Sequence, residues 1–283
     1  MVFIGSIHHG NLFPIFAGMY SAPELVLKYI RWYLHAANGK GHGVHSPFVF
    51  DFIKYVKNKK LLLTEYQDIE ALRNSLLAEK KSIEVEDFGA GSAKLKPGSR
   101  QVSKMAASSL KPKKFAQLIF RIVKYYRPVN ILELGTSFGI TTAYMAKAFP
   151  AANIISLEGA PAVAAIARKN MDTLHLTNVE IRQGSFEVQL PRVPEAMADI
   201  DLAFIDGHHL KAPTLQYFHF LRTYMPEEGI IIFDDIHWSA GMEAAWAEIK
   251  SHPSVTLSLD LFFIGIVFFR KDFKHKQHFS LRF

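Results

Sequence analysis

The spacing of apolar and polar residues changes along the chain and indicates its architecture. From residue 112 onward, short apolar runs bounded by turn residues alternate with segments whose apolar residues recur at helical spacing. The first pattern predicts buried strands, and the second predicts amphipathic helices. Strands and helices that alternate in this way are typical of an α/β protein with a doubly wound, mostly parallel, Rossmann-like sheet.

Seven strands and five helices are expected in this part of the chain. The strands are 131–134, 153–158, 178–182, 200–205, 229–233, 255–260 and 264–270. The helices are 115–126, 141–149, 161–173, 210–224 and 239–251. The last two strands lie too close together for a helix between them, so we expect a C-terminal antiparallel hairpin. The remaining residues, 271–283, are basic and are expected to form an exposed tail.

The first 111 residues show helical spacing without the strand pattern. Helices are predicted over 22–37, from a Ser46-Pro47 start onward, and over 64–80. We therefore expect two units. A helical N-terminal region (1–111) covers the site and selects the substrate, and an α/β domain (112–270) carries the chemistry.

A basic run without acidic residues joins the two units at 94–114. Its charged members are Lys94, Lys96, Arg100, Lys104, Lys111, Lys113 and Lys114. Such a run is typical of a solvated linker or an exposed helix face. A lid that closes over the site and contacts an anionic substrate is the alternative, and both stay open. Just before the run, DFGAGS (87–92) resembles a nucleotide loop, but no apolar strand precedes it and no helix follows it.

Composition narrows the class of protein. The hydrophobic share of 49% and the charged share of 21% are those of a globular protein. The absence of cysteine excludes disulfides, thiolate zinc sites and a cysteine nucleophile. It fits a reducing compartment, so we expect a cytoplasmic protein. A formal net charge of +7 is compatible with anionic partners, but a basic surface without a specific partner explains it more simply.

Neither a membrane span nor a secretory signal is expected. No apolar run reaches the roughly 18 residues that a transmembrane helix needs. The first 20 residues are apolar, but they lack a basic start and are interrupted by polar residues and by Pro14. We expect the natural start to be Met19, with 1–18 an over-extended reading of the gene.

A strand, a glycine turn and a helix follow one another at 129–142, VNILELGTSFGITT. Such a crossing brings free backbone N–H groups and a helix N-terminus together beside a carboxylate, which is the outline of a nucleotide site. A phosphate-binding P-loop needs Lys-Ser/Thr after its second glycine, whereas Ile140 follows Gly139. The dinucleotide fingerprint G-x-G-x-x-G is also missing, because Ser137 stands where its second glycine would be.

The remaining spacing, Glu-x-Gly-x-x-x-Gly before a helix, resembles motif I of the class I S-adenosylmethionine (SAM)-dependent methyltransferases. Among these, ELGTSFGITT looks most like the small-molecule O-methyltransferases of the catechol and caffeoyl-CoA type. The resemblance implies that SAM is the cofactor. It also implies that the methionine end of SAM is surrounded by Glu133, Gly135, Thr136, Ser137 and Gly139.

Two further segments resemble SAM contacts of this family. Glu158 ends the second strand, where the family has an acid that bonds both ribose hydroxyls. A carboxylate can accept two hydrogen bonds from a vicinal diol, which explains the residue type independently. Gly184, Ser185 and Phe186 follow the third strand, and the resemblance assigns them to the adenine end.

Three aspartates stand at the ends of the next two strands, Asp206 after one and Asp234 and Asp235 after the other. Ends of neighbouring parallel strands meet at one edge, so these carboxylates are candidates to bind one hard cation. In the catechol type the corresponding residues are Asp, Asp and Asn and hold magnesium, so the resemblance implies Mg²⁺. In the alternative, Asp206 contacts SAM or caps a helix and Asp234 simply ends its strand.

Two histidines are candidates for the general base. His209 stands where the catechol type has a lysine, three residues after the first metal-binding aspartate, and imidazole takes up a proton near neutral pH. His237 is a rival base or an additional metal ligand. A packing or surface role stays open for both.

Together these features predict a SAM-dependent methyltransferase that transfers a methyl group to a hydroxyl of a small-molecule acceptor with divalent-metal assistance. One alternative is a metal-independent enzyme that methylates nitrogen or a protein. Another is a non-catalytic protein of this fold that binds nucleic acid or another anionic surface. The basic residues are not interleaved with aromatic ones, so a nucleic-acid partner is not expected. An anionic acceptor and a homodimer are further expectations.

Overall fold

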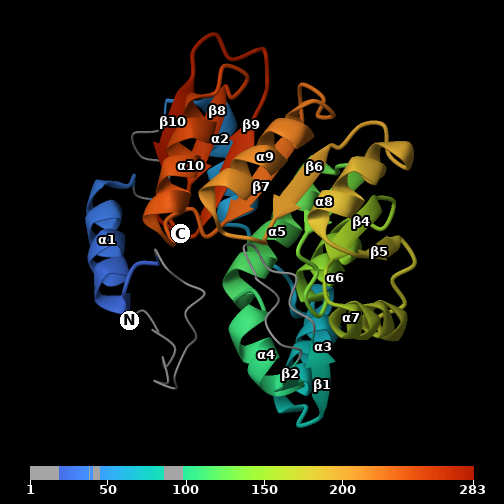
Figure 1. Cartoon of the computed structure of the whole chain (residues 1–283). Helices are drawn as coiled ribbons and strands as arrows, with labels where there is room; N and C mark the ends of the chain where they lie inside the picture. The colour runs from blue at the N-terminus through green and yellow to red at the C-terminus, as the bar shows by residue number, and fades with distance from the viewer. Residues whose placement is uncertain (1–18, 38, 41–44, 86–97) are drawn as a thin grey trace.

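A single eight-stranded sheet forms the centre of the computed structural model, which describes residues 19–37, 39–40, 45–85 and 98–283 (Figure 1). The strand order is β10-β8-β9-β7-β6-β3-β4-β5. The strands are β3 (Asn130–Leu134), β4 (Asn153–Glu158), β5 (Val179–Gln183), β6 (Leu202–Ile205), β7 (Ile230–Asp234), β8 (Leu257–Asp260), β9 (Ile264–Phe268) and β10 (Gln277–Ser280). Strand β9 runs antiparallel to β7 and β8, and the other pairs in this sheet are parallel.

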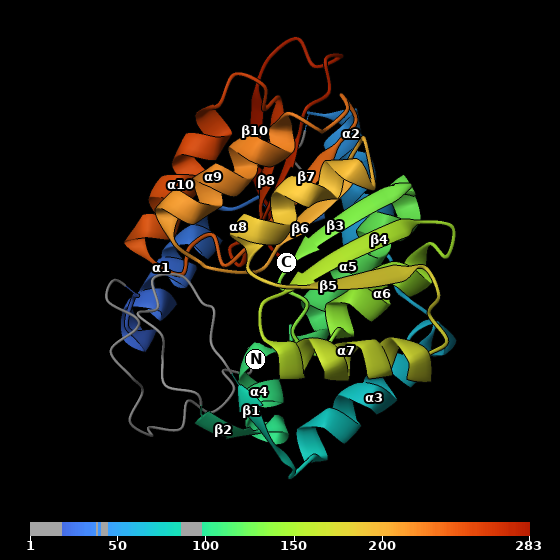
Figure 2. The same cartoon turned by 45° about the vertical axis from the view of Figure 1, so that its right-hand side comes forward.

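Helices cover both faces of the sheet, and Figures 1 and 2 show the two layers from different sides. On one face lie α8 (Phe186–Gln189), α9 (Lys211–Arg222) and α10 (Ala240–Ser251). The other side carries α2 (Pro47–Asp51) with its π-helical continuation (Phe52–Lys57), α5 (Lys113–Tyr126), α6 (Ile140–Ala148) and α7 (Pro161–Thr173). The predicted doubly wound α/β fold is confirmed.

The two cores follow from the alternation of side chains along each strand. In β7, Ile230 and Ile232 pack in the core that contains residues of α5, whereas Ile231 and Phe233 pack in the core that contains residues of α9. All four side chains are at most 2% exposed. Strands buried on both faces therefore read as continuous apolar runs, which is why they could be located in the sequence.

The predicted helices and strands of the α/β part are present with shifts of a few residues. In the N-terminal region, α1 (Ala22–His35) and α3 (Gln67–Ala78) match two predicted helices, and Pro47 begins α2 as expected. Ser46 holds the N-cap position of α2, but its side chain makes no capping hydrogen bond. The short helix α8 and the 3₁₀ segment Leu190–Glu195 after it were not predicted.

The expectation of an exposed C-terminal tail is wrong for its last part. Residues Gln277–Ser280 form β10, which pairs in parallel with β8 and extends the predicted seven strands to eight. Leu281 is completely buried in the same core as α5. The alternation of basic and apolar residues in KHKQHFSLRF concealed this strand, because its charged side chains suggested a solvated segment.

The segment before α5 is also more ordered than a solvated linker. Strands β1 (Ser82–Val85) and β2 (Gly98–Gln101) form a small antiparallel sheet, and α4 (Val102–Ser109) follows. Residues of α3 and α4 share a core with α6 and α7, so the boundary predicted at 111/112 stays a prediction. The predictions for 1–18, for DFGAGS (87–92) and for residues 94–97 concern positions outside the described residues.

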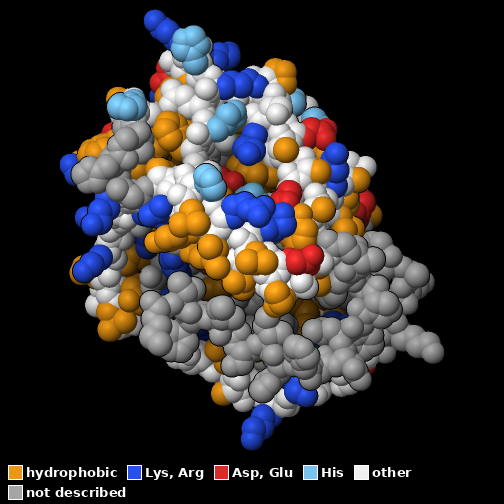
Figure 3. Space-filling view, turned by 90° about the vertical axis from the view of Figure 1, so that its left-hand side faces the viewer, with side chains coloured by type: hydrophobic (Ala, Val, Ile, Leu, Met, Phe, Trp, Pro, Cys, Tyr) orange, Lys and Arg blue, Asp and Glu red, His pale blue; other side chains and the backbone are white. Residues whose placement is uncertain are grey.

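Helix α1 lies at the periphery and contains no buried residue. Its aromatic side chains Tyr29 and Trp32 contact Phe262, with ring centroids 5.0 and 5.5 Å apart, and Leu27 and Leu34 are 66% and 69% exposed. Figure 3 shows hydrophobic and basic side chains mixed on this face. Within the described ranges, none of the helices combines the length and apolar character needed to cross a bilayer.

Replacing Leu281 by alanine tests whether β10 belongs to the folded core. Truncation of a fully buried leucine leaves a cavity, so we expect Leu281→Ala to lower the free energy of unfolding by about 3 kcal/mol. Leu27→Ala is the matched control, because that leucine is 66% exposed and its truncation should cost at most about 0.5 kcal/mol. Urea unfolding measures both, and equal small losses would mean that the tail does not pack in solution.

Candidate active site

Four acidic side chains meet at the carboxyl ends of four parallel strands. Glu133 lies within β3, Glu158 ends β4, Asp206 directly follows β6, and Asp234 ends β7. The register aligns Leu134 with Ile205, so the ends of β3 and β6 lie side by side. Parallel strands place these acids at one edge, where an open α/β sheet binds its ligands. The structure thus brings the predicted acids together.

The turn after β3 depends on glycine. Gly135 has φ +106°, and a Cβ there would lie 2.1 Å from the carbonyl oxygen of Asp206. Ser137 also has a positive φ, of 49°, and Gly139 has φ 81° and caps the N-terminus of α6. The turn consequently runs against the β6 end and directs the first backbone N–H groups of α6 toward the same edge.

Glu133 is fully buried and has an oxygen without a partner. Its Oε2 accepts hydrogen bonds from the hydroxyls of Thr142 and Ser156, whereas Oε1 is buried and has no hydrogen-bond partner among the described residues. Burial raises the pKa of Glu133 to about 8, even though those two hydroxyls act in the opposite direction. A carboxyl held in this way is suited to a cationic ligand that supplies the missing donor.

Glu158 is tied to the glycine turn. Its Oε2 accepts from the backbone N–H of Ser137 at 2.8 Å, and its Oε1 accepts from the N–H of Ala160 at 3.0 Å. Carboxylate oxygens accept more than one hydrogen bond each, so the same side chain retains acceptor capacity for a diol. The backbone contacts fix its direction at the end of β4.

The predicted adenine segment follows β5. Gly184 has φ 141°, and its N–H donates to the carbonyl of Glu158 at 2.9 Å. Phe186 is only 8% exposed, and its ring lies 5.0 Å from His208 and 5.8 Å from Tyr217. This packing keeps Phe186 mostly within the core, and its assignment to adenine, like that of Ser185, stays a prediction.

Lys111 reaches into the aspartate cluster from outside the sheet. It lies in the connector between α4 and α5, and its side chain is 9% exposed. Its Nζ is 3.2 Å from Asp206 Oδ2 and forms an ion pair with Asp234 Oδ2. In the sequence this residue is one of several lysines in a basic run, and only its neighbours Leu110 and Pro112 distinguish it. For Lys111, neither the solvated linker nor the exposed helix face is correct.

One ammonium faces three carboxyl groups in this cluster. Burial alone would lower the pKa of Lys111, but the charges of Asp206, Asp234 and Asp235 outweigh it and raise the pKa. Burial opposes ionisation of Asp206 as well, yet Lys111 and His209 hold its pKa below the usual value. Burial and the charges of the neighbouring aspartates raise the pKa of Asp234. The pKa of Asp235 is also raised, mainly by burial. Lysine therefore stays charged here, while the cluster cannot carry three full negative charges.

The arrangement gives a mixed answer for a divalent metal. One donor atom each from Asp206, His209 and Asp234 lies within 4.8 Å of the other two, so these three side chains converge as metal ligands would. Asp235 is not part of that group. The ammonium of Lys111 already binds both carboxylates. A Mg²⁺ ion would have to lie about 2.1 Å from the same oxygens, where the positive charge of Lys111 would repel it. The donors do not fit Mg²⁺ while Lys111 holds this position, and the metal set stays a prediction.

The two candidate bases differ in their surroundings. His209 lies at the cluster, with Nε2 3.6 Å from Asp206 Oδ1. In His237, both ring nitrogens are engaged, Nδ1 with Glu243 at 3.1 Å and Nε2 with Asp260 at 2.9 Å. A histidine clamped between two carboxylates is suited to holding α10 near the β8–β9 turn, so His209 is the better placed of the two for proton transfer.

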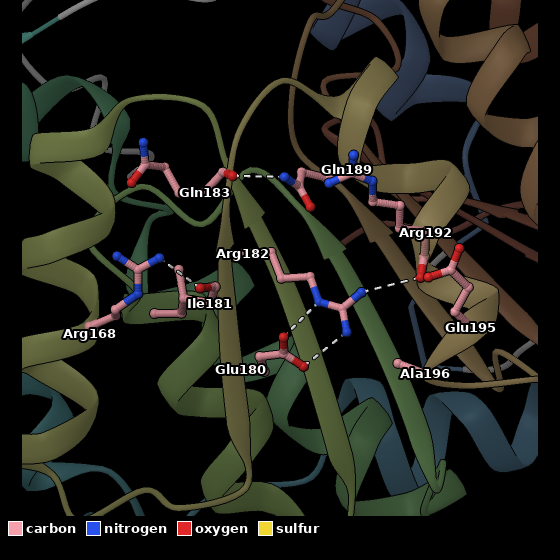
Figure 4. Close-up of a pocket in the computed structure, with 9 residues that line it drawn as sticks. All are labelled: Arg168, Glu180, Ile181, Arg182, Gln183, Gln189, Arg192, Glu195 and Ala196. Carbon is pink, nitrogen blue, oxygen red and sulfur yellow. Dashed lines mark hydrogen bonds and ion pairs between the residues drawn. The ribbon is translucent and has the colours of Figure 1, made fainter.

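A separate hollow of about 520 Å³ lies at the outer edge of the sheet along β5 (Figure 4). Arg182 spans it, binding Glu180 through two nitrogens and the carbonyl of Arg192. None of the four strand-end acids lines it. Glu180 and Arg182 neutralise each other there, and the hollow is not part of the site described above.

Comparison with known proteins classifies the central part of the chain. The model of a methyltransferase domain family matches residues 132–236, from β3 past the end of β7. These residues form a methyltransferase domain. The match contains the glycine turn, Glu158, Asp206 and the aspartates of β7, and it confirms the family resemblance of the ELGTSFGITT motif.

Individual relatives agree with this classification. A catechol O-methyltransferase from Niastella koreensis is 37% identical over 137 residues, which are 47% of this chain and 60% of that protein's length. An O-methyltransferase from Bacillus cereus, solved with SAH, has a TM-score of 0.53 at 19% identity over 78% of this chain and 97% of the other. An SAH-bound methyltransferase from Podospora anserina has a TM-score of 0.55 at 13% identity over 93% and 100%. The methyltransferase domain shares its fold with both structures.

His237 should make stability depend on pH in a defined direction. Burial alone lowers its pKa, but hydrogen bonds and ion pairs with Asp260 and Glu243 raise it overall. The stabilisation is then complete below the unfolded pKa of about 6.5 and is lost as pH rises through the higher folded pKa. We expect His237→Gln to cost about 2 kcal/mol near pH 6 and clearly less at alkaline pH.

Urea unfolding of wild type and variant at several pH values measures this difference. His275→Gln is the control, because His275 is exposed and its replacement should leave the unfolding free energy unchanged at each pH. A His237→Gln deficit that does not change with pH would show that the ion pairs of His237 do not contribute.

Proposed function

We propose that the protein is a SAM-dependent methyltransferase that methylates a hydroxyl group of a small-molecule acceptor. The observation that carries the proposal is the glycine turn at 135–139, set between the unpartnered oxygen of buried Glu133 and the carboxylate of Glu158. The two acids offer acceptors for an ammonium and for a diol, and SAM has both groups.

The residues of the turn would bind and orient this cofactor. Glu133 Oε1 would accept from the α-ammonium of SAM, and Glu158 would accept from the ribose hydroxyls. Gly184, Ser185 and Phe186 would border the adenine. When bound, SAM would supply a methyl carbon, and the bond from sulfur to that carbon would break to leave a neutral thioether. The methyl carbon would form its new bond to the acceptor oxygen, which must lose its proton.

The aspartate cluster would prepare the acceptor. His209 Nε2, beside Asp206, is the group placed to take the hydroxyl proton. Positive charge is needed close to the oxygen as it becomes negative. A divalent metal on Asp206 and Asp234 would supply this charge, but only after Lys111 had left the cluster.

The acceptor class rests on the relatives. The relative from Niastella koreensis is named for catechol, and the match covers 47% of this chain and 60% of that protein, so a hydroxylated small molecule is as far as the proposal goes. Methylation of nitrogen or of a protein is the alternative reaction. Catechol serves as the first probe, since its adjacent hydroxyls test oxygen methylation directly.

Calorimetric titration with SAM and SAH tests cofactor binding, and mass spectrometry of catechol incubated with enzyme and SAM tests transfer. Gly135→Ala places a Cβ against the Asp206 backbone at a positive φ, so we expect it to weaken SAM binding about tenfold or more. Gly241→Ala is the matched control, because its nearest contacts are at 3.7 Å and beyond and it should bind normally. A wild-type protein that binds neither SAM nor SAH would refute the proposal.

The raised pKa of Glu133 predicts that SAM affinity depends on pH. Below its pKa of about 8 the carboxyl is protonated in the free protein, and binding of an ammonium must release that proton. Affinity should therefore rise by up to about tenfold per pH unit from pH 6 and stop rising near pH 8, where the α-amino group of free SAM itself loses its proton. Glu133→Gln should bind more weakly and with no such slope. Equal slopes in both proteins would assign the titration to another group.

A further inference from the structure

Lys111 is held in the cluster by contacts at both its backbone and its side chain. Its carbonyl accepts a hydrogen bond from Arg73 Nη1 at 2.8 Å, and Arg73 is in turn paired with Glu70 at 3.0 Å. Two residues earlier, Ser109 Oγ lies 2.9 Å from Ser137 Oγ of the glycine turn. The connector is thereby anchored to α3 and to the cofactor turn, and the lysine has a defined direction.

The side chain places its charge between the two carboxylates that a metal would use. Nζ lies against Asp206 Oδ2 and Asp234 Oδ2, and the side chain is 9% exposed. A metal can arrive from solvent, whereas this charge is covalently attached and is present in every folded molecule. An ammonium also carries three N–H donors. Two are directed to these carboxylates, so one remains to donate to an acceptor oxygen.

We propose that the ammonium of Lys111 takes the place of the divalent cation in this site, and that methyl transfer needs no metal. The inference rests on the proposed function for the identity of the reaction. Lys111 orients the acceptor hydroxyl by donating a hydrogen bond to its oxygen. It also stabilises the negative charge that develops there as the hydroxyl loses its proton to a base. Asp206 and Asp234 hold the ammonium in place and are themselves neutralised in part by it.

Metal binding is the first test, because it does not depend on knowing the acceptor. The full-length protein is treated with EDTA, desalted and titrated with Mn²⁺ by calorimetry and electron paramagnetic resonance, with and without SAH. We expect no stoichiometric Mn²⁺ binding below about 1 mM. Stoichiometric binding at micromolar Mn²⁺ in the wild type, lost in Asp234→Asn, would overturn the inference.

Variants at Lys111 separate its charge from its bulk. Lys111→Met removes the ammonium and frees the carboxylates, so we expect it to gain at least about tenfold in Mn²⁺ affinity. Lys113→Met is the matched control, because it removes the same charge two residues further on, at the start of α5, from a side chain that is 50% exposed, and it should gain no Mn²⁺ site. Equal Mn²⁺ binding by both variants would count against a specific role of Lys111.

Turnover gives the second readout, with any hydroxylated probe that the wild type methylates. EDTA should leave wild-type turnover unchanged, and Lys111→Met should lose about a hundredfold or more while SAH binding stays within about threefold. Lys111→Arg keeps the charge and should retain more activity than Lys111→Met. Loss of wild-type turnover in EDTA with recovery in Mg²⁺ would overturn the inference.

The outcomes distinguish the two proposals. Failure of the wild type to bind SAM or SAH would remove the proposed function itself, whereas SAM binding with metal-dependent turnover would remove only the role of Lys111. If circular dichroism shows that Lys111→Met does not fold, the wild-type Mn²⁺ titration and its response to EDTA still decide the question.

Discussion

Crowding of three aspartates, one of them buried and two partly buried, is the constraint on which the site depends. Strands β6 and β7 are parallel neighbours, so Asp206 and Asp234 end at the same place and Asp235 follows directly. Buried carboxylates repel one another and lose their hydration, so a folded chain must supply a cation or keep protons on them. Here the cation comes from a segment that precedes the first strand of the large sheet. The N-terminal region is thus electrostatically part of the aspartate cluster.

The segment that supplies this cation also links the aspartate cluster to the glycine turn. Ser109, which ends α4 just before the connector, contacts Ser137 of the glycine turn. Arg73 holds the backbone of Lys111 in the connector itself. A shift of the glycine turn would therefore also shift the segment that carries Lys111. Under the proposed function, methyl donor and acceptor must be aligned within a fraction of an ångström, and a shared anchor would position both relative to the same segment.

The parts of the fold that were predictable have a simple physical signature. Strands buried on both faces are continuous apolar runs, and the acids at their ends interrupt those runs, so Glu133, Glu158, Asp206 and Asp234 could be placed from the sequence. Lys111 could not be singled out, because its role arises from a contact with residues about 95 and 123 positions away, which no local pattern records. His237 likewise resembled a base until its two carboxylate partners, one of them on β8, were known. β10 was missed because an edge strand needs only one apolar face, and the basic residues on either side of it dominated the composition of the segment.

The two borders of the large sheet are protected in different ways. On one side, β10 pairs with β8. Leu281, just after β10, forms a β-bridge to Ala37, just after α1, so these two distant segments pack at the same border of the sheet. On the other side, β5 presents the charged pair Glu180 and Arg182, which discourages another strand from adding there. Peeling of β10 would uncover β8 with its buried apolar residues, creating a template for intermolecular pairing. Resistance of this protein to aggregation in concentrated solution would then depend on residues 277–281, far from the strand-end acids.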